Sequence, residues 1–201
     1  MSKNKLPVME TFYSLQGEGI FSGSPAYFIR LAGCDVGCVW CDVKDSWDIT
    51  GYPQLEVTGL AQQVAASGAR IVVITGGEPL MYDLAELTAA LHRSDLRVHL
   101  ETSGAYPLSG EWDWICVSPK KFKPPLPAVM QQADELKIIV ANKHDLQWAA
   151  ERAKEVAQGC TLLLQPEWSK AAAMLPEIIS FAKQNPAWRL SLQTHKYLNI
   201  P

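Results

Sequence analysis

Short runs of apolar residues recur along the chain, and polar residues and turn signals separate one run from the next. Runs of this length predict β-strands, here over residues 8–14, 27–31, 71–74, 97–100, 114–117, 136–140, 161–164 and 189–192. Between the later runs, apolar residues at helical spacing predict helices over residues 60–66, 84–92, 145–157 and 172–183. Gly68 is expected to end the first helix and Asp145 to cap the start of the third. Strands that alternate with helices predict an α/β protein with a mostly parallel sheet.

Polar residues collect where five of the predicted strands end. These clusters are Thr75-Gly76-Gly77-Glu78-Pro79, Glu101-Thr102-Ser103-Gly104, Ser118-Pro119-Lys120, Gln165-Pro166 and Gln193-Thr194-His195. In barrel-like α/β folds the active site is built from the carboxyl ends of the parallel strands, so we expect one shared site. A complete barrel of this kind takes about 250 residues. The chain has 201 residues. We therefore expect a single domain over residues 1–201, folded as an open, partial (β/α) TIM-like barrel.

Three cysteines lie close together in the loop after the second predicted strand. Cys34, Cys38 and Cys41 are separated by three residues and then by two. Three thiolates can hold three irons of a four-iron cluster and leave the fourth iron open to a small molecule. The alternative is a structural zinc site, but zinc takes four ligands, and the next His is as far away as His92. The spacing therefore favours a [4Fe-4S] cluster over zinc, and the two remaining cysteines are expected to be small buried residues.

Charge and hydropathy exclude several classes of protein. The net charge is −3, from 18 basic and 21 acidic residues, so the chain lacks the basic surface of a nucleic-acid-binding protein. No apolar run reaches the length of a membrane span, and the lysines at the N-terminus are not followed by the apolar stretch of a signal peptide. Five cysteines without such a signal favour the cytoplasm, where thiols stay reduced.

The paired glycines of Gly76-Gly77-Glu78 let a ligand approach the backbone closely, and the Glu78 carboxylate or the adjacent backbone can bind an ammonium group. Combined with Cys34, Cys38, Trp40 and Cys41, this motif resembles the radical S-adenosylmethionine (SAM) superfamily. The resemblance implies that SAM binds the open iron through its methionyl amine and carboxylate. It also implies that one electron from the cluster then cleaves the sulfonium to give a 5′-deoxyadenosyl radical.

Further motifs, over nearly the whole length, narrow the resemblance. Leu15-Gln16-Gly17-Glu18-Gly19, Arg30, Glu101-Thr102-Ser103-Gly104, Ser118-Pro119-Lys120 and the segment 193–201 resemble the 7-carboxy-7-deazaguanine synthases. That family converts 6-carboxy-5,6,7,8-tetrahydropterin to 7-carboxy-7-deazaguanine, with ring contraction and loss of ammonia, on the route to queuosine and other 7-deazapurines. The resemblance also implies a homodimer and a one-electron donor of the flavodoxin or ferredoxin type.

The resemblance divides the expected site residues into two groups. The substrate is expected to contact Leu15, Gln16, Gly17, Glu18, Arg30, Thr75, His195 and Pro201, the last through the terminal carboxylate. SAM is expected to contact Trp40, Gly76, Gly77, Glu78, Glu101, Ser103, Ser118, Pro119, Lys120 and Gln165. Physical chemistry agrees with part of this division, because amide and carboxylate groups can read the donor–acceptor edge of a pterin. The planar guanidinium of an arginine suits the substrate carboxylate.

One position departs from the family pattern. The family has Asp-Thr after the last cysteine, and the threonine hydroxyl helps to bind a Mg²⁺ ion that also touches the substrate carboxylate. This chain has Asp42-Val43. Magnesium takes oxygen ligands, and a valine side chain has none. We expect either that Asp42, water and substrate hold the ion, or that magnesium matters less here.

Two other functions compete with this interpretation. One is a radical SAM activating enzyme that acts on a protein partner, which would need no pterin pocket. The other is a non-catalytic iron–sulfur electron carrier. Such a carrier usually closes its cluster with a fourth ligand, and it has no use for the Gly76-Gly77-Glu78 turn.

Overall fold

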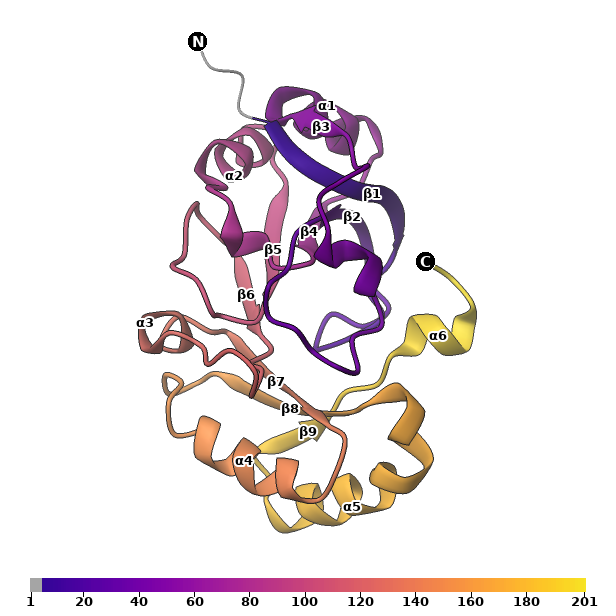
Figure 1. The fold of residues 1–201 in the computed structure, drawn as a ribbon, viewed down its shortest axis with the longest axis vertical. Helices are drawn as coiled ribbons and strands as arrows, with labels where there is room; N and C mark the ends of the chain where they lie inside the picture. The colour runs from indigo at the N-terminus through magenta and orange to yellow at the C-terminus, as the bar shows by residue number, and fades with distance from the viewer. Residues whose placement is uncertain (1–4) are drawn as a thin grey trace.

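The computed structural model describes residues 5–201, which form one mixed β-sheet (Figure 1). The strand order is β3-β1-β2-β4-β5-β6-β7-β8-β9, from one edge to the other, so the sheet is open. β1 pairs antiparallel with β2 and β3, and the neighbours from β2 to β9 pair in parallel. The strands are β1 Lys5–Leu15, β2 Pro25–Leu31, β3 Gln54–Glu56, β4 Ile71–Gly76, β5 Arg97–Thr102, β6 Trp114–Val117, β7 Glu135–Val140, β8 Thr161–Pro166 and β9 Trp188–Leu190. The expected α/β fold with a mostly parallel, open sheet is confirmed.

The helices follow the strands as the sequence predicts, with two short additions, α3 and α6. They are α1 Val57–Ala66, α2 Ala85–His92, α3 Pro127–Met130, α4 His144–Arg152, α5 Ala171–Gln184 and α6 Thr194–Leu198, with 3₁₀ turns η1 Lys44–Trp47, η2 Pro79–Met81 and η3 Trp168–Lys170. Gly68 directly follows the C-cap Ser67 of α1 and has a φ of 76°, as a helix end requires. The short strand β3 and the helices α3 and α6 were not predicted.

Several predicted boundaries are wrong, and β1 and α1 already begin three residues earlier than predicted, at Lys5 and Val57. α4 ends at Arg152 rather than at residue 157, because the Lys154 and Glu155 N–H groups bond to carbonyls only three positions back, and the Arg152 side chain pairs with Glu155. Asp145 lies inside the first turn of α4 and does not cap it. Its carboxylate instead accepts N–H bonds from the preceding loop, at residues 141 and 142. The last strand is β9, Trp188–Leu190, and the chain leaves the sheet at Ser191.

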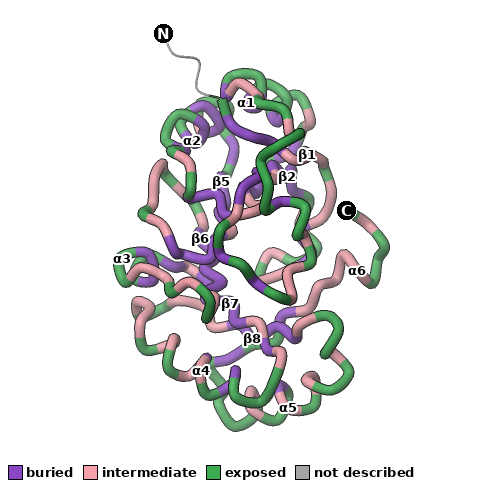
Figure 2. Tube along the Cα trace, in the orientation of Figure 1, coloured by how far each residue is buried: buried purple, intermediate pink, exposed green. Residues whose placement is uncertain are grey.

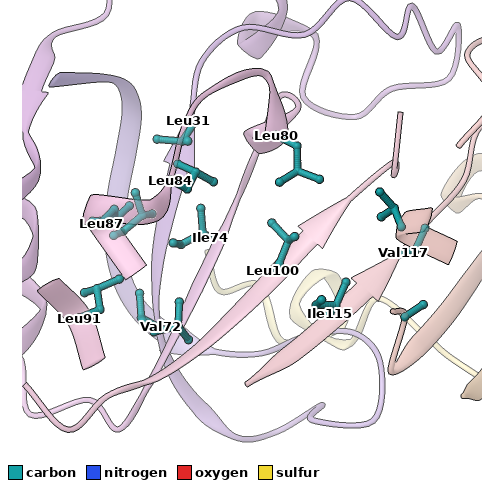
Figure 3. Packing of buried hydrophobic residues seen from close by; sticks show 14 of the residues in the cluster. Leu31, Val72, Ile74, Leu80, Leu84, Leu87, Leu91, Leu100, Ile115 and Val117 are labelled. Carbon is teal, nitrogen blue, oxygen red and sulfur yellow. The ribbon is translucent and has the colours of Figure 1, made fainter. Parts of the chain in front are cut away.

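The strands separate an apolar face from a polar face. Val72 and Ile74 of β4, Leu100 of β5 and the corresponding residues of the next strands pack with α1, α2 and the other covering helices in one core (Figure 3). Because side chains alternate along a strand, the residues between them point to the other face. That face carries Arg30, Thr75, Glu101, Ser118, Lys137 and Gln165, all of which line a cavity. In Figure 2 the buried strands run through the centre, while exposed loops and helix faces surround them.

No helix within residues 5–201 is long and apolar enough to span a membrane.

His99 is a buried ionisable residue on the polar face of β5. Its side chain is 3% exposed, its ring centroid lies 4.6 Å from that of Phe21, and its Nε2 has no hydrogen-bond partner. Burial, together with the nearby Arg97, lowers the pKa of His99 to about 4, because the charged imidazolium loses its hydration. The unfolded chain therefore takes up this proton more readily than the folded protein as the pH falls below about 6.5.

We predict that His99→Leu flattens the acid dependence of stability. Between pH 7 and pH 4 the wild-type chain should lose about 3 kcal/mol of unfolding free energy through His99, and the variant should not. Urea titrations followed by circular dichroism at several pH values measure this difference. His144→Gln, at an exposed position on α4, is the matched control. Equal pH dependence in wild type and His99→Leu would contradict the prediction.

Candidate active site

A cavity of about 610 Å³ lies at the carboxyl ends of the parallel strands. All but one of the residues that the sequence assigns to the site line it, and they come from segments that lie far apart in the chain. They are Leu15, Gln16, Gly17, Glu18, Arg30, Cys34, Cys38, Trp40, Cys41, Asp42, Val43, Thr75, Gly76, Gly77, Glu78, Glu101, Ser103, Ser118, Lys120, Gln165, His195 and Pro201. Pro119 is buried but does not line the cavity. The expected shared pocket at the strand ends is therefore present.

The cysteine loop forms one wall of this cavity. Cys38 is buried, Cys34 and Cys41 are half-buried, and the Cys41 N–H donates to the Cys38 carbonyl at 3.0 Å. Burial raises the pKa of the Cys38 thiol to about 11 and also raises that of Cys34, and repulsion among the neighbouring thiolates adds to both shifts. These thiols therefore ionise readily only when a metal supplies positive charge.

The arrangement of the thiols suits a cluster better than a single ion. Within residues 5–201, no three His, Cys, Asp or Glu side chains converge closely enough to hold one metal ion. A zinc site needs such convergence, whereas in an iron–sulfur cluster each thiolate binds a separate iron. Cys34, Cys38 and Cys41 share one loop and one cavity wall, and Cys41 lies close enough to contribute to the raised pKa of both Cys34 and Cys38. The donor set thus fits a [4Fe-4S] cluster.

The main chain ties the cysteine loop to the glycine turn after β4. The Gly77 N–H donates to the Leu31 carbonyl at 2.8 Å, and the Glu78 N–H donates to the Gly33 carbonyl at 2.9 Å. A Cβ atom at Gly77 would lie 2.1 Å from the Gly33 oxygen, and one at Gly76 would lie 2.2 Å from the Leu31 oxygen. Gly76 also has a φ of 124°. Only glycine allows this approach, so the turn and the start of the cysteine loop form one rigid unit.

The Glu78 carboxylate is held by the protein itself. The residue is 1% exposed, and its two oxygens accept bonds from the Leu80 and Ser103 N–H groups and from the Thr102 and Ser103 hydroxyls, at 2.5 to 3.0 Å. These four donors fill the acceptor sites of a carboxylate. Glu78 therefore fixes the turn to the end of β5, and the backbone of the turn is left to face a ligand.

Lys137 lies on the opposite side of the cavity and was not predicted from the sequence. Its side chain is 4% exposed, and its Nζ lies 2.6 Å from Glu18 Oε2 and 2.7 Å from Glu101 Oε2. Burial alone would raise the pKa of the Glu18 carboxyl, but the charge and hydrogen bonds of Lys137, with help from Gln193 and Gln165, lower it to about 2. Burial would lower the pKa of Lys137, but the acidic groups around it raise that pKa well above its usual value.

The loop after β1 is fixed by the tail of the chain. The Thr194 N–H donates to the Gly17 carbonyl at 2.8 Å, and a Cβ atom at Gly17 would lie 2.1 Å from His195 Nδ1. Burial lowers the pKa of the His195 imidazole. Ser14 Oγ donates to the Pro201 backbone oxygen at 3.2 Å. His195 and Pro201 thus line the cavity through α6.

Arg30 lines the cavity, and its planar guanidinium group is held by Phe12 and Glu10. Its guanidinium carbon is 5.7 Å from the centre of the Phe12 ring, and its Nε is 2.7 Å from Glu10 Oε1. That contact is an ion pair whose geometry does not make a hydrogen bond, so Nε has no hydrogen-bond partner. The side chain is 21% exposed and lines the cavity, so the group is accessible to a carboxylate ligand.

Asp42 is already paired, and Val43 provides no side-chain oxygen. Asp42 Oδ2 accepts bonds from Lys196 Nζ at 2.8 Å and from Gln193 Nε2 at 3.2 Å. The sequence reading missed Gln193 and Lys196 as contacts of this residue. Burial would raise the pKa of the Asp42 carboxyl, but Lys196 lowers it below its usual value. Position 43 therefore lacks the side-chain oxygen that the family's threonine supplies.

The two remaining cysteines lie away from the loop. Cys116 is buried, and its Sγ donates to Glu135 Oε1 at 3.3 Å. Cys160 is half-buried and packs against the main core. Cys116 therefore has a polar partner that its apolar surroundings in the sequence did not predict.

An open α/β sheet with a three-cysteine loop tied to a Gly-Gly turn defines the class of protein. The chain belongs to the Radical SAM superfamily, whose family model matches residues 28–157. Membership implies a [4Fe-4S] cluster and S-adenosylmethionine as cofactors.

Full-length relatives identify the family within this superfamily, and the chain belongs to the 7-carboxy-7-deazaguanine synthases. A 7-carboxy-7-deazaguanine synthase from Flavobacterium psychrophilum is 53% identical over 98% of this chain and 93% of its own length. One from Synechocystis sp. is 50% identical over 96% of this chain and 93% of its own length. The crystal structure of QueE from Escherichia coli matches with a TM-score of 0.83 at 34% identity, and the match covers 95% of each chain.

We predict that Gly77→Ala weakens both the fold and the cysteine loop. The new methyl group must displace the Gly33 carbonyl, which should cost about 1–3 kcal/mol of unfolding free energy. Iron bound per chain after anaerobic reconstitution should fall together with the melting temperature. Gly59→Ala is the matched control, because a Cβ atom there meets nothing within 4 Å. Wild-type iron content and stability in Gly77→Ala would show that the close approach is not required.

Proposed function

We propose that this chain converts 6-carboxy-5,6,7,8-tetrahydropterin to 7-carboxy-7-deazaguanine, with ring contraction and release of ammonia. The observation that carries the proposal is the cavity in which the cysteine loop and the Gly-Gly turn face Gln16, Glu18, Arg30 and His195. An activating enzyme or an electron carrier would have no need for the polar half of the cavity that Gln16, Glu18, Arg30 and His195 form. The family to which the chain belongs supports the same reaction.

The cysteine half holds the cofactors in this proposal. Cys34, Cys38 and Cys41 bind the cluster, and Trp40 packs near the adenine. The backbone of Gly76 and Gly77 receives the methionyl amine, since the Glu78 carboxylate is saturated by protein donors. Glu101, Ser103, Ser118, Lys120 and Gln165 complete the cofactor side. When bound, the cluster and S-adenosylmethionine supply the one-electron chemistry that starts the ring contraction.

The opposite half recognises the pterin. Gln16 and Glu18 accept and donate hydrogen bonds along the ring edge, with the backbone of Leu15 and Gly17 and the Thr75 hydroxyl beside them. Arg30 binds the substrate carboxylate through its planar guanidinium, whose N–H groups lie at the cavity edge. His195 and the terminal carboxylate of Pro201 close the site from α6. Lys137 keeps Glu18 ionised, so that this residue acts as an acceptor.

The proposal includes partners and a compartment. A one-electron donor of the flavodoxin or ferredoxin type reduces the cluster, and the chain acts as a single-domain protomer of a homodimer. We place the reaction in the cytoplasm, since all five cysteines are free thiols and such thiols stay reduced there. The product is a precursor of queuosine or of another 7-deazapurine.

We predict that the anaerobically reconstituted protein makes 7-carboxy-7-deazaguanine from 6-carboxytetrahydropterin, S-adenosylmethionine and a chemical reductant. Liquid chromatography with mass spectrometry detects the product. Cys38→Ser should abolish turnover, because the cluster loses one of its three thiolates. Cys160→Ser is the matched control, since Cys160 lies outside the cavity. A protein with an intact cluster that forms no product from this pterin would refute the proposal.

The surroundings of Asp42 determine how the site can bind Mg²⁺. Asp42 is held by Lys196 and Gln193, and Val43 lacks a side-chain oxygen. We infer that the Lys196 ammonium supplies the positive charge beside Asp42, and that any Mg²⁺ is held only by Asp42, water and substrate. Turnover should then depend less on magnesium than it does in members with Asp-Thr at this point.

We predict that chelation and added Mg²⁺ change the wild-type kcat/KM by less than about threefold, below the tenfold step that corresponds to ~1.4 kcal/mol. Val43→Thr restores an oxygen ligand and should increase the response to magnesium. Initial rates with chelator and with increasing Mg²⁺ measure both effects. Val39→Thr, at an exposed position of the same loop, is the control. Strong stimulation of the wild-type enzyme by magnesium would contradict the inference.

A further inference from the structure

Lys137 stands where the two halves of the cavity meet. It projects from the middle of β7, and its Nζ contacts Glu18 at 2.6 Å and Glu101 at 2.7 Å. Glu18 belongs to the loop after β1, on the pterin side, whereas Glu101 is the penultimate residue of β5, on the cofactor side. One buried ammonium group therefore joins two carboxylates that serve different ligands in the proposed function.

The two carboxylates share this one ammonium as their counter-charge. Besides Lys137, Glu18 accepts a hydrogen bond from the Gln193 amide at 2.9 Å, and Glu101 accepts one from the Gln16 amide at 3.4 Å, and both amides are neutral. Two neighbouring carboxylates in a buried site cannot both ionise without a compensating cation, so one of them would take up a proton. That carboxyl group would then donate a hydrogen bond at a point where its ligand needs an acceptor.

The same strand also supports the loop that carries Glu18. Glu135 lies two residues before Lys137 and on the same face of β7, and its Oε2 accepts the Ile20 N–H at 3.1 Å. Gln16 gives the loop a second link to the cofactor side, because it donates to Glu101 and also accepts the Glu18 N–H at 3.1 Å. The loop over residues 16–20 is thus anchored to β7 and to Glu101, and an ordered Glu101 orders the loop.

On the basis of the proposed function, we propose that Lys137 is a positioning residue that makes the binding of S-adenosylmethionine and of the pterin cooperative. A ligand that fixes Glu101 also fixes the Lys137 ammonium, and through it Glu18. The second ligand then meets a carboxylate that is already ordered, so it loses less conformational entropy on binding. By linkage, the pterin must strengthen S-adenosylmethionine binding by the same factor.

The test measures binding without turnover. Anaerobic titration calorimetry on the reconstituted protein, with no reductant, gives the dissociation constant of each ligand alone and with the other saturating. In the wild type we expect each ligand to tighten the other about tenfold, within the usual range for coupled sites. Lys137→Met should bring this factor close to one, and Lys137→Arg should retain most of it. Lys143→Met, at an exposed ion pair with Glu177 on the far helices, should keep the wild-type factor.

A second variant keeps the test decisive if Lys137→Met does not fold. Glu101→Gln preserves the shape of the side chain and removes its negative charge. It should weaken binding of the pterin several-fold even when S-adenosylmethionine is absent. A folded Lys137→Met protein with wild-type coupling overturns the proposal, and so does unchanged pterin affinity in Glu101→Gln. Absence of coupling in the wild type also overturns it. Failure of the wild type to bind the pterin at all would instead contradict the proposed function, and the inference with it.

Discussion

Successive side chains of a strand point to opposite faces of its sheet, and the rest of this molecule depends on how the parallel strands use that constraint. On one face, residues such as Val72, Ile74 and Leu100 pack against the helices in a dry core. On the other face, the same strands carry Thr75, Glu101 and the polar residues that line the cavity. A shift of one residue in register would exchange the two sets, so core packing also fixes the positions of the site residues.

The polar face buries charges, and the chain balances them in two different ways. Glu78 accepts four bonds from backbone and hydroxyl donors, which holds its carboxylate rigid without a cation. Glu18 and Glu101 share the Lys137 ammonium. A charge without either kind of partner would be too costly to bury at these positions. The first solution builds a fixed turn, and the second leaves two acceptors that ligands can still reach.

Much of this could be predicted from sequence, because local patterns specify it. The apolar runs located the strands, the cysteine spacing located the loop, and the polar clusters at strand ends located the cavity. The features that were missed depend on contacts between distant segments. Lys137 looks like an isolated charge in an apolar strand until it meets Glu18, 119 positions away, and α6 is defined by its contact with Gly17. Asp145 has the residue type of a helix cap, but its carboxylate bonds to the preceding loop.

The tie between the cysteine loop and the Gly-Gly turn is made by main-chain atoms, through Leu31, Gly33 and Gly77. Such a tie tolerates change in the surrounding side chains as long as the glycines remain. The residues on the opposite half of the cavity come instead from the loop after β1, from β2 and from the tail. Over evolutionary time, a chain built in this way can acquire new substrate-facing residues without dismantling its redox centre.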